Sequence, residues 1–437
     1  MSTKHRKPKD LLRPIWKSIQ GLFRKFTRLP EEGIVSDEPI DFSAPSVPYY
    51  TGLAERFNLA RIVLYMILFT FVVVTVLSSR HLITYENLYY LVKDVGAATL
   101  TAQSEADYLS YPISDAEADF AIYRGGLTVV GGQEITVLSG SGKQTLSENV
   151  SMSRPCVRAG EKTFLTFSRG ENGFAVYNAF VRLHKELTEY PIYDGCMSAE
   201  GAFAILTRSR EYTSQVVYYG SNMNVRAIAN ISGYVTALSI SADGRTLAIL
   251  SYDLTDTGYQ SKLTLCMAGN PKEITVVTEN TSALSAAFLG DNRLAVIFED
   301  RLSIYKNDGS LVSETPFEDT VPLLCDVNDS YFALLCRTRD NLIGSVLQVY
   351  DKNGRSVYTA NVALAGQAEE ILLEGQNVYI RSREHILYVS GKGKKLSEAT
   401  AHRDTLTLLV TENGGLLACG PAYAQRLNTE DFTEISQ

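Results

Sequence analysis

The stretch Val235-Thr-Ala-Leu-Ser-Ile-Ser-Ala-Asp-Gly-Arg-Thr-Leu-Ala-Ile-Leu250 sets the pattern for most of this chain. Two runs of β-forming residues flank the turn Ser241-Ala-Asp-Gly244, where glycine supplies the positive φ that a tight turn needs. From Phe120 onward the texture continues as short runs of Val, Ile, Leu, Tyr, Phe and Thr separated by Gly, Asn and Asp. The sequence therefore predicts an all-β domain.

A longer period runs through these strands. Each unit has an apolar strand, a short turn and a second strand that ends in an aromatic or apolar pair. The units begin near residues 126, 163, 202, 246, 293, 331, 377 and 415. A spacing of about 40 residues is typical of four-stranded propeller blades, whereas a β-sandwich has frequent turns but no such superperiod. We predict a β-propeller of eight blades.

Seven blades are the alternative, because the first and last units are incomplete. The strand Asp119-Phe-Ala-Ile-Tyr123 is expected to close the ring against the C-terminal strands, which would remove exposed sheet edges. Glycine turns are also expected at Asn307-Asp-Gly309, Lys352-Asn-Gly354 and Gly391-Lys-Gly393.

Two phrases carry a resemblance to known proteins. The stretch from Val235 to Leu250 resembles a strand-turn-strand phrase of WD40-like and TolB-like bacterial propellers, and Tyr350-Asp-Lys-Asn-Gly354 resembles their hairpins. The whole layout is similar to an uncharacterised family of membrane-anchored, propeller-like proteins from Gram-positive bacteria. The resemblance implies the propeller fold and a membrane anchor, but no activity, because propellers host many functions.

One apolar segment precedes the β region. Residues 62–79 contain no charge and are bounded by Arg61 and Arg80. As a helix they would cover about 27 Å, close to the roughly 30 Å hydrocarbon core of a bilayer. We predict a single transmembrane helix within residues 57–79; the alternatives are a buried core helix or a strand of a large sheet. About sixty residues precede the segment, which argues against a signal peptide.

Charge is divided unevenly around this segment. Residues 1–30 carry nine Lys and Arg against one acid, so subtracting the tail's +8 from the whole-chain −8 leaves −16 for the remainder. The positive-inside rule places the N-terminus in the cytoplasm and everything after Ser79 outside the cytoplasmic membrane. Such an acidic remainder argues against nucleic-acid binding.

The tail also has helical periodicity. Apolar residues recur at three- and four-residue steps between Leu11 and Phe26, with basic residues opposite, which predicts an amphipathic helix on the anionic inner leaflet. A helix packed on a partner protein and a disordered tail are the alternatives. The residues expected at the membrane surface are Arg13, Trp16, Lys17, Phe23, Arg24, Lys25 and Phe26.

The predicted organisation follows from these segments. It comprises a basic helix over 1–30, a cytoplasmic linker over 31–56, the transmembrane helix over 57–79, a stalk over 80–118 and the propeller over 119–437.

Residues with chemical potential are few. The propeller's histidines, His184, His385 and His402, fall in different units, and Ser139-Gly-Ser-Gly-Lys-Gln144 lacks the spacing of a phosphate loop and predicts a plain turn. We therefore assign no catalytic, cofactor-binding or metal-binding residue and expect no cofactor.

The cysteines and tyrosines are expected to be structural. Buried free thiols are favoured over disulfides for the cysteines, with Cys325 and Cys336 as the one pair whose spacing fits adjacent strands. The six cysteines are Cys156, Cys196, Cys266, Cys325, Cys336 and Cys419. Tyrosines near strand ends are expected to fill gaps between blades rather than stack on a carbohydrate or peptide; they are Tyr177, Tyr218, Tyr219, Tyr305, Tyr350 and Tyr388.

The leading functional hypothesis is a membrane-anchored binding module at the cell envelope, with the lipid bilayer and an envelope protein or polymer as partners. The alternative is an envelope hydrolase or lyase with its site at the mouth of the propeller channel.

Overall fold

The computed structural model describes residues 48–78 and 108–435, apart from 114, 141, 257, 269–273, 280, 291, 318, 340–343, 365 and 412–413. The chain divides into two compact units, Met1–Lys93 and Asp94–Gln437. The first contains helix α2 and the second contains eight β-sheets.

Helix α2 extends over Pro48–Ser78. Large apolar side chains along it are exposed, including Phe57 and Phe69, and the Arg61 guanidinium donates to the Tyr65 hydroxyl at 3.0 Å. Within the part of the chain that the structure describes, no helix combines the length and apolarity needed to cross a membrane. The predicted transmembrane helix is therefore not confirmed.

The predicted membrane-surface residues and Arg80 lie outside the described residues. They remain predictions from the sequence.

The eight sheets are propeller blades, and consecutive strands pair antiparallel within each. Blades 1 to 3 are β2 (Asp119–Tyr123), β3 (Gly126–Val130), β4 (Glu134–Leu138), β5 (Gln144–Asn149); β6 (Pro155–Ala159), β7 (Phe164–Ser168), β8 (Gly173–Tyr177), β9 (Arg182–Leu187); and β10 (Ile192–Met197), β11 (Phe203–Thr207), β12 (Ser214–Tyr219), β13 (Val225–Ile231). Blades 4 to 6 are β14 (Tyr234–Ile240), β15 (Thr246–Thr255), β16 (Gly258–Met267), β17 (Ile274–Glu279); β18 (Ala283–Leu289), β19 (Arg293–Phe298), β20 (Arg301–Tyr305), β21 (Leu311–Pro316); and β22 (Thr320–Val327), β23 (Tyr331–Thr338), β24 (Ser345–Asp351), β25 (Ser356–Val362).

The last two blades depart from this plan. Blade 7 contains β26 (Glu370–Glu374), β27 (Asn377–Ser382), β28 (His385–Val389), β29 (Leu396–Thr400) and, at its outer edge, β33 (Thr433–Glu434). Blade 8 contains β30 (Thr407–Val410), β31 (Leu416–Cys419), β32 (Tyr423–Leu427) and β1 (Tyr108–Ser110), and a 3-10 turn over Thr429–Asp431 precedes β33. Eight blades are therefore confirmed over seven.

Burial within a blade explains the sequence pattern. The second strands β3, β7 and β11 are buried at every position because neighbouring blades cover both faces, so they are continuous apolar runs. The outermost strand β9 alternates between exposed and half-buried positions and is largely polar. Each repeat unit found in the sequence corresponds to the two middle strands of one blade.

The core lies between blades. In one buried cluster, Leu347 and Val349 of blade 6 pack with Val378 and Ile380 of blade 7. The predicted packing role of the tyrosines is confirmed for five of the six, which are buried, while Tyr388 is half-buried; the five are Tyr177, Tyr218, Tyr219, Tyr305 and Tyr350. The predicted turns are confirmed as well, because Gly244, Gly309, Gly354 and Gly393 all have φ between 64° and 80°.

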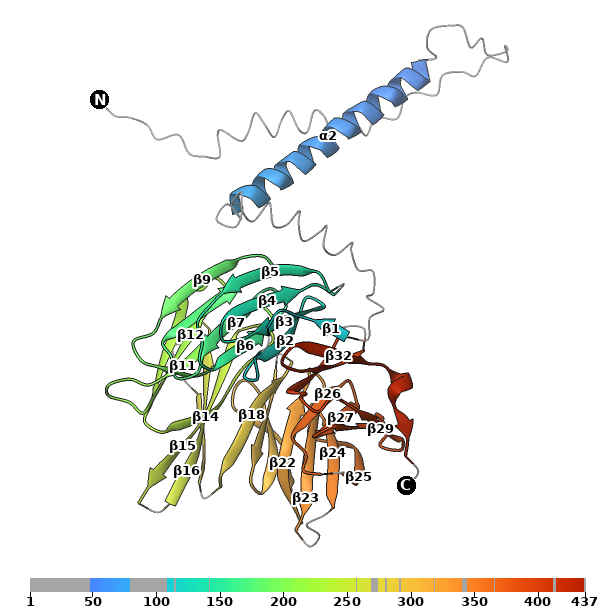
Figure 1. Cartoon of the computed structure of the whole chain (residues 1–437). Coiled ribbons are helices and arrows are strands. Elements are labelled where there is room, and N and C mark those ends of the chain that lie inside the picture. The colour runs from blue at the N-terminus through green and yellow to red at the C-terminus, as the bar shows by residue number, and fades with distance from the viewer. Residues whose placement is uncertain are drawn as a thin grey trace, which may run out of the picture. The chain divides into compact units, whose positions relative to one another are not determined.

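Ring closure differs from the prediction. The strand Asp119–Tyr123 begins blade 1, and it is β1 that pairs with β32, through Tyr108↔Gln425 and Ser110↔Tyr423. The C-terminal region supplies only three strands to blade 8, so its outer edge takes a strand from residues that were expected to form the stalk. In Figure 1 the cyan β1 lies beside the red β32.

Candidate functional site

The first strand of each blade lies innermost. Each contacts the first strand of the next blade, and β30 contacts β2 to complete the ring. Because every blade is entered by the same connection from an outer to an inner strand, the innermost strands run in one direction. Their N-terminal ends therefore meet at one mouth of the central channel.

Four adjacent blades carry an irregularity at this mouth. In blades 3 to 6, the innermost strands β10, β14, β18 and β22 each skip one residue in their pairing with the second strand. The innermost strands of blades 1, 2, 7 and 8 pair without a shift. The skipped residues, here called the mouth arc, are Tyr193, Thr236, Leu284 and Leu323. A β-bulge leaves its extra residue unpaired and redirects the side chain.

The mouth arc is exposed in spite of its apolar character. Tyr193 is 44% exposed, Leu284 47% and Leu323 39%, and Thr236 is also exposed. The bulges in four adjacent blades bring these side chains into solvent at one mouth, which makes this end a candidate binding surface.

A longer hairpin extends the exposed apolar surface in blade 4. Strands β15 and β16 have ten residues each, and the pairs Tyr234↔Tyr252 and Leu254↔Tyr259 lie on one face of the sheet, here called the hairpin face. All four side chains are exposed. The rings of Tyr234 and Tyr252 stack with centroids 5.5 Å apart.

Charged side chains link blades 1, 2 and 3. Asp119 Oδ2 in blade 1 accepts the amide N–H of Val157 at 2.9 Å and a hydrogen bond from Arg158 Nη1 at 3.3 Å. Asp194 Oδ1 in blade 3 lies 3.5 Å from Arg158 Nη2 and 3.2 Å from Arg169 Nη2. The chain Asp119–Arg158–Asp194 thus connects three blades.

A second charged link joins blades 7 and 8. Arg381 is only 7% exposed, and its guanidinium donates to Glu369 at 2.6 Å and to Glu370 at 3.0 Å. It also donates to the carbonyl oxygens of Thr405 and Leu406. All three nitrogens of this buried guanidinium therefore donate a hydrogen bond.

The acids of the innermost strands also bind backbone amides. Glu370 accepts the N–H of Leu408 at 3.0 Å, and Asp326 accepts the N–H of Leu373 at 2.7 Å. Burial, with a smaller contribution from the charge of Glu370, raises the pKa of Asp326 to about 6. These carboxylates are structural links between blades.

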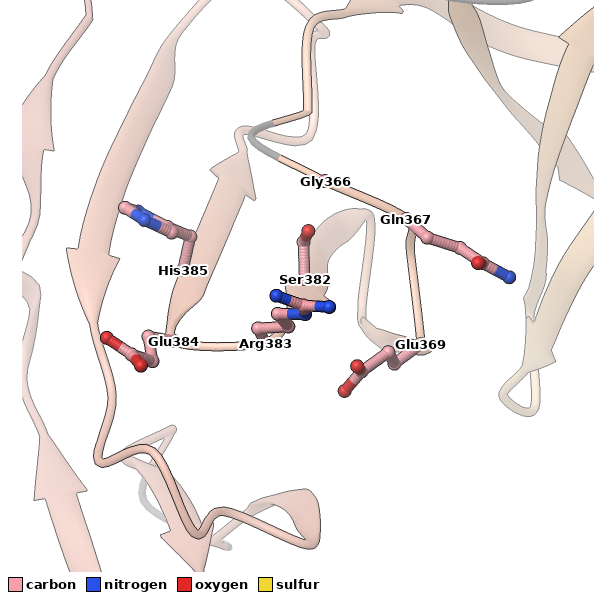
Figure 2. Close-up of a pocket in the computed structure, with 7 residues that line it drawn as sticks. All are labelled: Gly366, Gln367, Glu369, Ser382, Arg383, Glu384 and His385. Carbon is pink, nitrogen blue, oxygen red and sulfur yellow. The ribbon is translucent and has the colours of Figure 1, made fainter.

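A polar cleft of about 680 Å³ opens in blade 7, between the segment that enters β26 and the turn between β27 and β28 (Figure 2). Its lining residues are Gly366, Gln367, Glu369, Ser382, Arg383, Glu384 and His385. The sequence predicted neither the cleft nor the mouth arc. A repeat of apolar strands every 40 residues gives no information on where a strand bulges or which loops contact each other.

The three histidines of the propeller lie apart from one another, each beside a different acid. The ring nitrogen of His184 lies 3.1 Å from a Glu186 oxygen. That of His385 lies 2.6 Å from Glu398, and that of His402 lies 3.7 Å from Asp404. Among the described residues, no group of three His, Cys, Asp or Glu side chains is arranged to hold a metal ion. The stretch from Ser139 to Lys143 is the turn between β4 and β5, as predicted.

All six cysteines are free, and four are buried. Cys325 and Cys336 lie on adjacent strands, but their register partners are Leu334 and Pro322, so they are not opposite each other. The structure thus agrees with buried free thiols at four positions, while Cys196 and Cys325 are half-buried.

These features define the chain as an eight-bladed β-propeller with a bulged, part-apolar and part-charged channel mouth. Residues 106–418 match a family of unknown function, DUF5711, and the protein belongs to that family. None of the curated proteins compared with the sequence matches it.

Solved structures share the architecture at low identity. BamB from Moraxella catarrhalis is 9% identical, with 74% of this chain and 100% of that chain covered and a TM-score of 0.50. The dihydro-heme d1 dehydrogenase NirN, in complex with DHE, is 12% identical, with 78% of this chain and 75% of that chain covered and a TM-score of 0.52. At such identities the similarity concerns the fold alone.

Proposed function

We propose that this protein is a binding protein of the cell envelope whose propeller holds an extended polypeptide segment of a partner protein at its channel mouth. The observation that carries the proposal is the set of β-bulges in four adjacent blades, which together expose the mouth arc. A β-propeller is well suited to protein interaction, because its mouth gathers residues from many blades around one point.

The chemistry of the mouth arc favours a polypeptide over a sugar or a nucleic acid. Leu284 and Leu323 are aliphatic and gain free energy only by covering other apolar groups, at about 25 cal/mol per Å² buried. Tyr193 and the hairpin face add tyrosines, which are enriched in protein interfaces. The charged blades opposite would give such a segment a fixed direction.

Substitution at the mouth tests the proposal. Leu284→Ser with Leu323→Ser should reduce capture of the partner from solubilised envelopes at least tenfold. The matched control is Leu187→Ser with Leu311→Ser, two exposed leucines on the outermost strands β9 and β21. A photo-crosslinking residue at position 284 should form an adduct that one at position 187 does not. Equal loss in both double variants, or equal crosslinking at both positions, would refute the proposal.

Attachment to the cytoplasmic membrane is the second part of the proposal. Its support is the uncharged segment 62–79, the basic tail and the exposed apolar side chains of α2. The tail would lie in the cytoplasm, with Arg13, Trp16, Lys17, Phe23, Arg24, Lys25 and Phe26 on the inner leaflet, and the propeller would lie outside.

Protease treatment of cells without their wall tests this orientation. It should remove epitopes after residue 79 and spare one placed at the N-terminus. Protection of the propeller in these wall-free cells would overturn the orientation. The double variant Leu68→Arg with Val74→Arg should be released from washed membranes. Full retention of this variant would contradict the proposed membrane anchor.

A further inference from the structure

The polar cleft in blade 7 differs in chemistry from the mouth arc, which belongs to blades 3 to 6. Its walls are the segment from Gly366 to Glu369 and the turn from Ser382 to His385 (Figure 2). A volume of about 680 Å³ is in the range of small-molecule sites, roughly 300–1,000 Å³.

The negative and titratable groups of the cleft already have partners. Glu369 accepts a hydrogen bond from Arg381 at 2.6 Å, and Glu384 lies 4.0 Å from Arg403. His385 contacts Glu398 at 2.6 Å. Both carboxylates of the cleft thus lie beside a cation of the protein itself, although Glu369 shares Arg381 with Glu370.

The hydrogen-bond donors of the cleft are not matched in this way. Ser382 is 3% exposed, and its hydroxyl has no hydrogen-bond partner among the described residues. Leaving such a group unsatisfied costs about 1–3 kcal/mol. Arg383 follows directly, is exposed and has no ion-pair partner within the described ranges.

The backbone supports this arrangement. Arg383 has a φ of 55°, a left-handed conformation that is uncommon for any residue with a side chain. Figure 2 shows Arg383 and Ser382 on the same turn, across from Gly366 and Gln367. Gly366 faces the same hydroxyl, because a Cβ at that position would lie 2.9 Å from Ser382 Oγ. A side chain at 366 would therefore crowd the hydroxyl.

We infer that the blade 7 cleft binds a small molecule through its carboxylate group. The Arg383 guanidinium pairs with the two carboxylate oxygens, the Ser382 hydroxyl donates to one of them, and the Gln367 amide borders the rest of the ligand. The carboxylate could belong to a sugar acid or to the C-terminus of a short peptide, since both present the same two acceptor oxygens.

Binding to the full-length protein in detergent tests the inference, with ligand-observed NMR as the readout. The probes are galacturonate against galactose, and trialanine against trialanine amide. In at least one pair, the probe with a free carboxylate should bind at least tenfold more tightly than its counterpart without one. The pair that shows this difference tells whether the carboxylate belongs to a sugar acid or to a peptide C-terminus. Equal signals within both pairs, or no binding at 20 mM, would overturn the inference.

Three variants locate the site. Arg383→Gln should weaken carboxylate binding at least tenfold, while Ser382→Ala and Gly366→Ala should each weaken it severalfold. Arg355→Gln, at an exposed turn in blade 6, is the matched control and should leave binding unchanged. Unchanged binding in Arg383→Gln would also refute the site. Leu284→Ser should leave carboxylate binding unchanged. The proposal for the cleft can therefore be refuted independently of the proposal for the mouth arc.

Discussion

The Asp326 carboxylate in blade 6 accepts the main-chain N–H of Leu373 in blade 7 at 2.7 Å. The same kind of contact recurs around the channel, from Asp119 to Val157 and from Glu370 to Leu408. Innermost strands have no strand partner on the channel side, so a side chain on one blade satisfies an amide on the next. Polar residues at these positions therefore hold the ring together.

The buried Asp326 should make stability depend on pH. Its pKa is about 6 in the folded protein against about 3.9 in an unfolded chain, so the folded state binds the proton more tightly. This contribution is present below about pH 4 and is lost as the pH rises through 6. Asp326→Asn should therefore gain up to about 3 kcal/mol relative to wild type between pH 4 and pH 8, measured by urea unfolding.

Asp308 provides a control of opposite sign. Hydrogen bonds from the Ser310 hydroxyl and amide lower its pKa, so its contribution is present at neutral pH and lost on acidification. Asp308→Asn should lose stability relative to wild type as the pH rises. A flat difference for Asp326→Asn would contradict the assigned pKa.

Closure of blade 8 should depend on Tyr111. Tyr111 directly follows β1, and its buried hydroxyl donates to the carbonyl oxygen of Gly420. Tyr111→Phe keeps the ring but leaves that carbonyl without its donor, so the free energy of unfolding should fall by about 1–2 kcal/mol. Tyr108→Phe, at an exposed ring, should change it by less than about 0.5 kcal/mol. Equal effects in calorimetry would argue against this role.

Arg381 should be the most sensitive charged residue of the propeller. Arg381→Met removes the partner of Glu369 and Glu370 and should lower the free energy of unfolding by about 3–5 kcal/mol. The exposed Arg355→Met is the comparison and should be nearly neutral. Thermal unfolding followed by circular dichroism would measure both, and a loss below about 1 kcal/mol for Arg381→Met would count against the link between blades 7 and 8.

The cysteines should react only after unfolding. Burial raises the pKa of Cys336 to about 11, and it also raises the pKa of Cys156 and Cys419. Iodoacetamide at pH 7.5 should therefore leave these three thiols unmodified in the native protein and alkylate all six cysteines in denaturant, as counted by mass spectrometry. Rapid native alkylation of Cys336 would contradict its burial, and a mass loss of two protons per pair would indicate disulfides.

The fold was predictable from the sequence where burial is complete. Runs such as Thr246-Leu-Ala-Ile-Leu250 lie between two blades, and their apolarity reveals one repeat per blade. The innermost and outermost strands are partly polar, so the sequence pattern did not resolve them. Closure by β1 was missed because three residues paired with a strand far along the chain leave no periodic signal.

The binding surfaces were less predictable for related reasons. A bulge at Leu284 or Leu323 depends on how two strands register, which one-dimensional spacing does not determine. The cleft at Ser382 depends on a loop from the preceding blade.

Closure by β1 has a consequence for synthesis. Tyr108 pairs with Gln425, roughly 300 residues later, so blade 8 cannot be completed until β32 has been synthesised. Any product that stops before β32 exposes the unpaired edge of β1, a site for aggregation or degradation. The first strand of the propeller domain therefore waits for its partner during synthesis, because β1 completes blade 8 by pairing with the late strand β32.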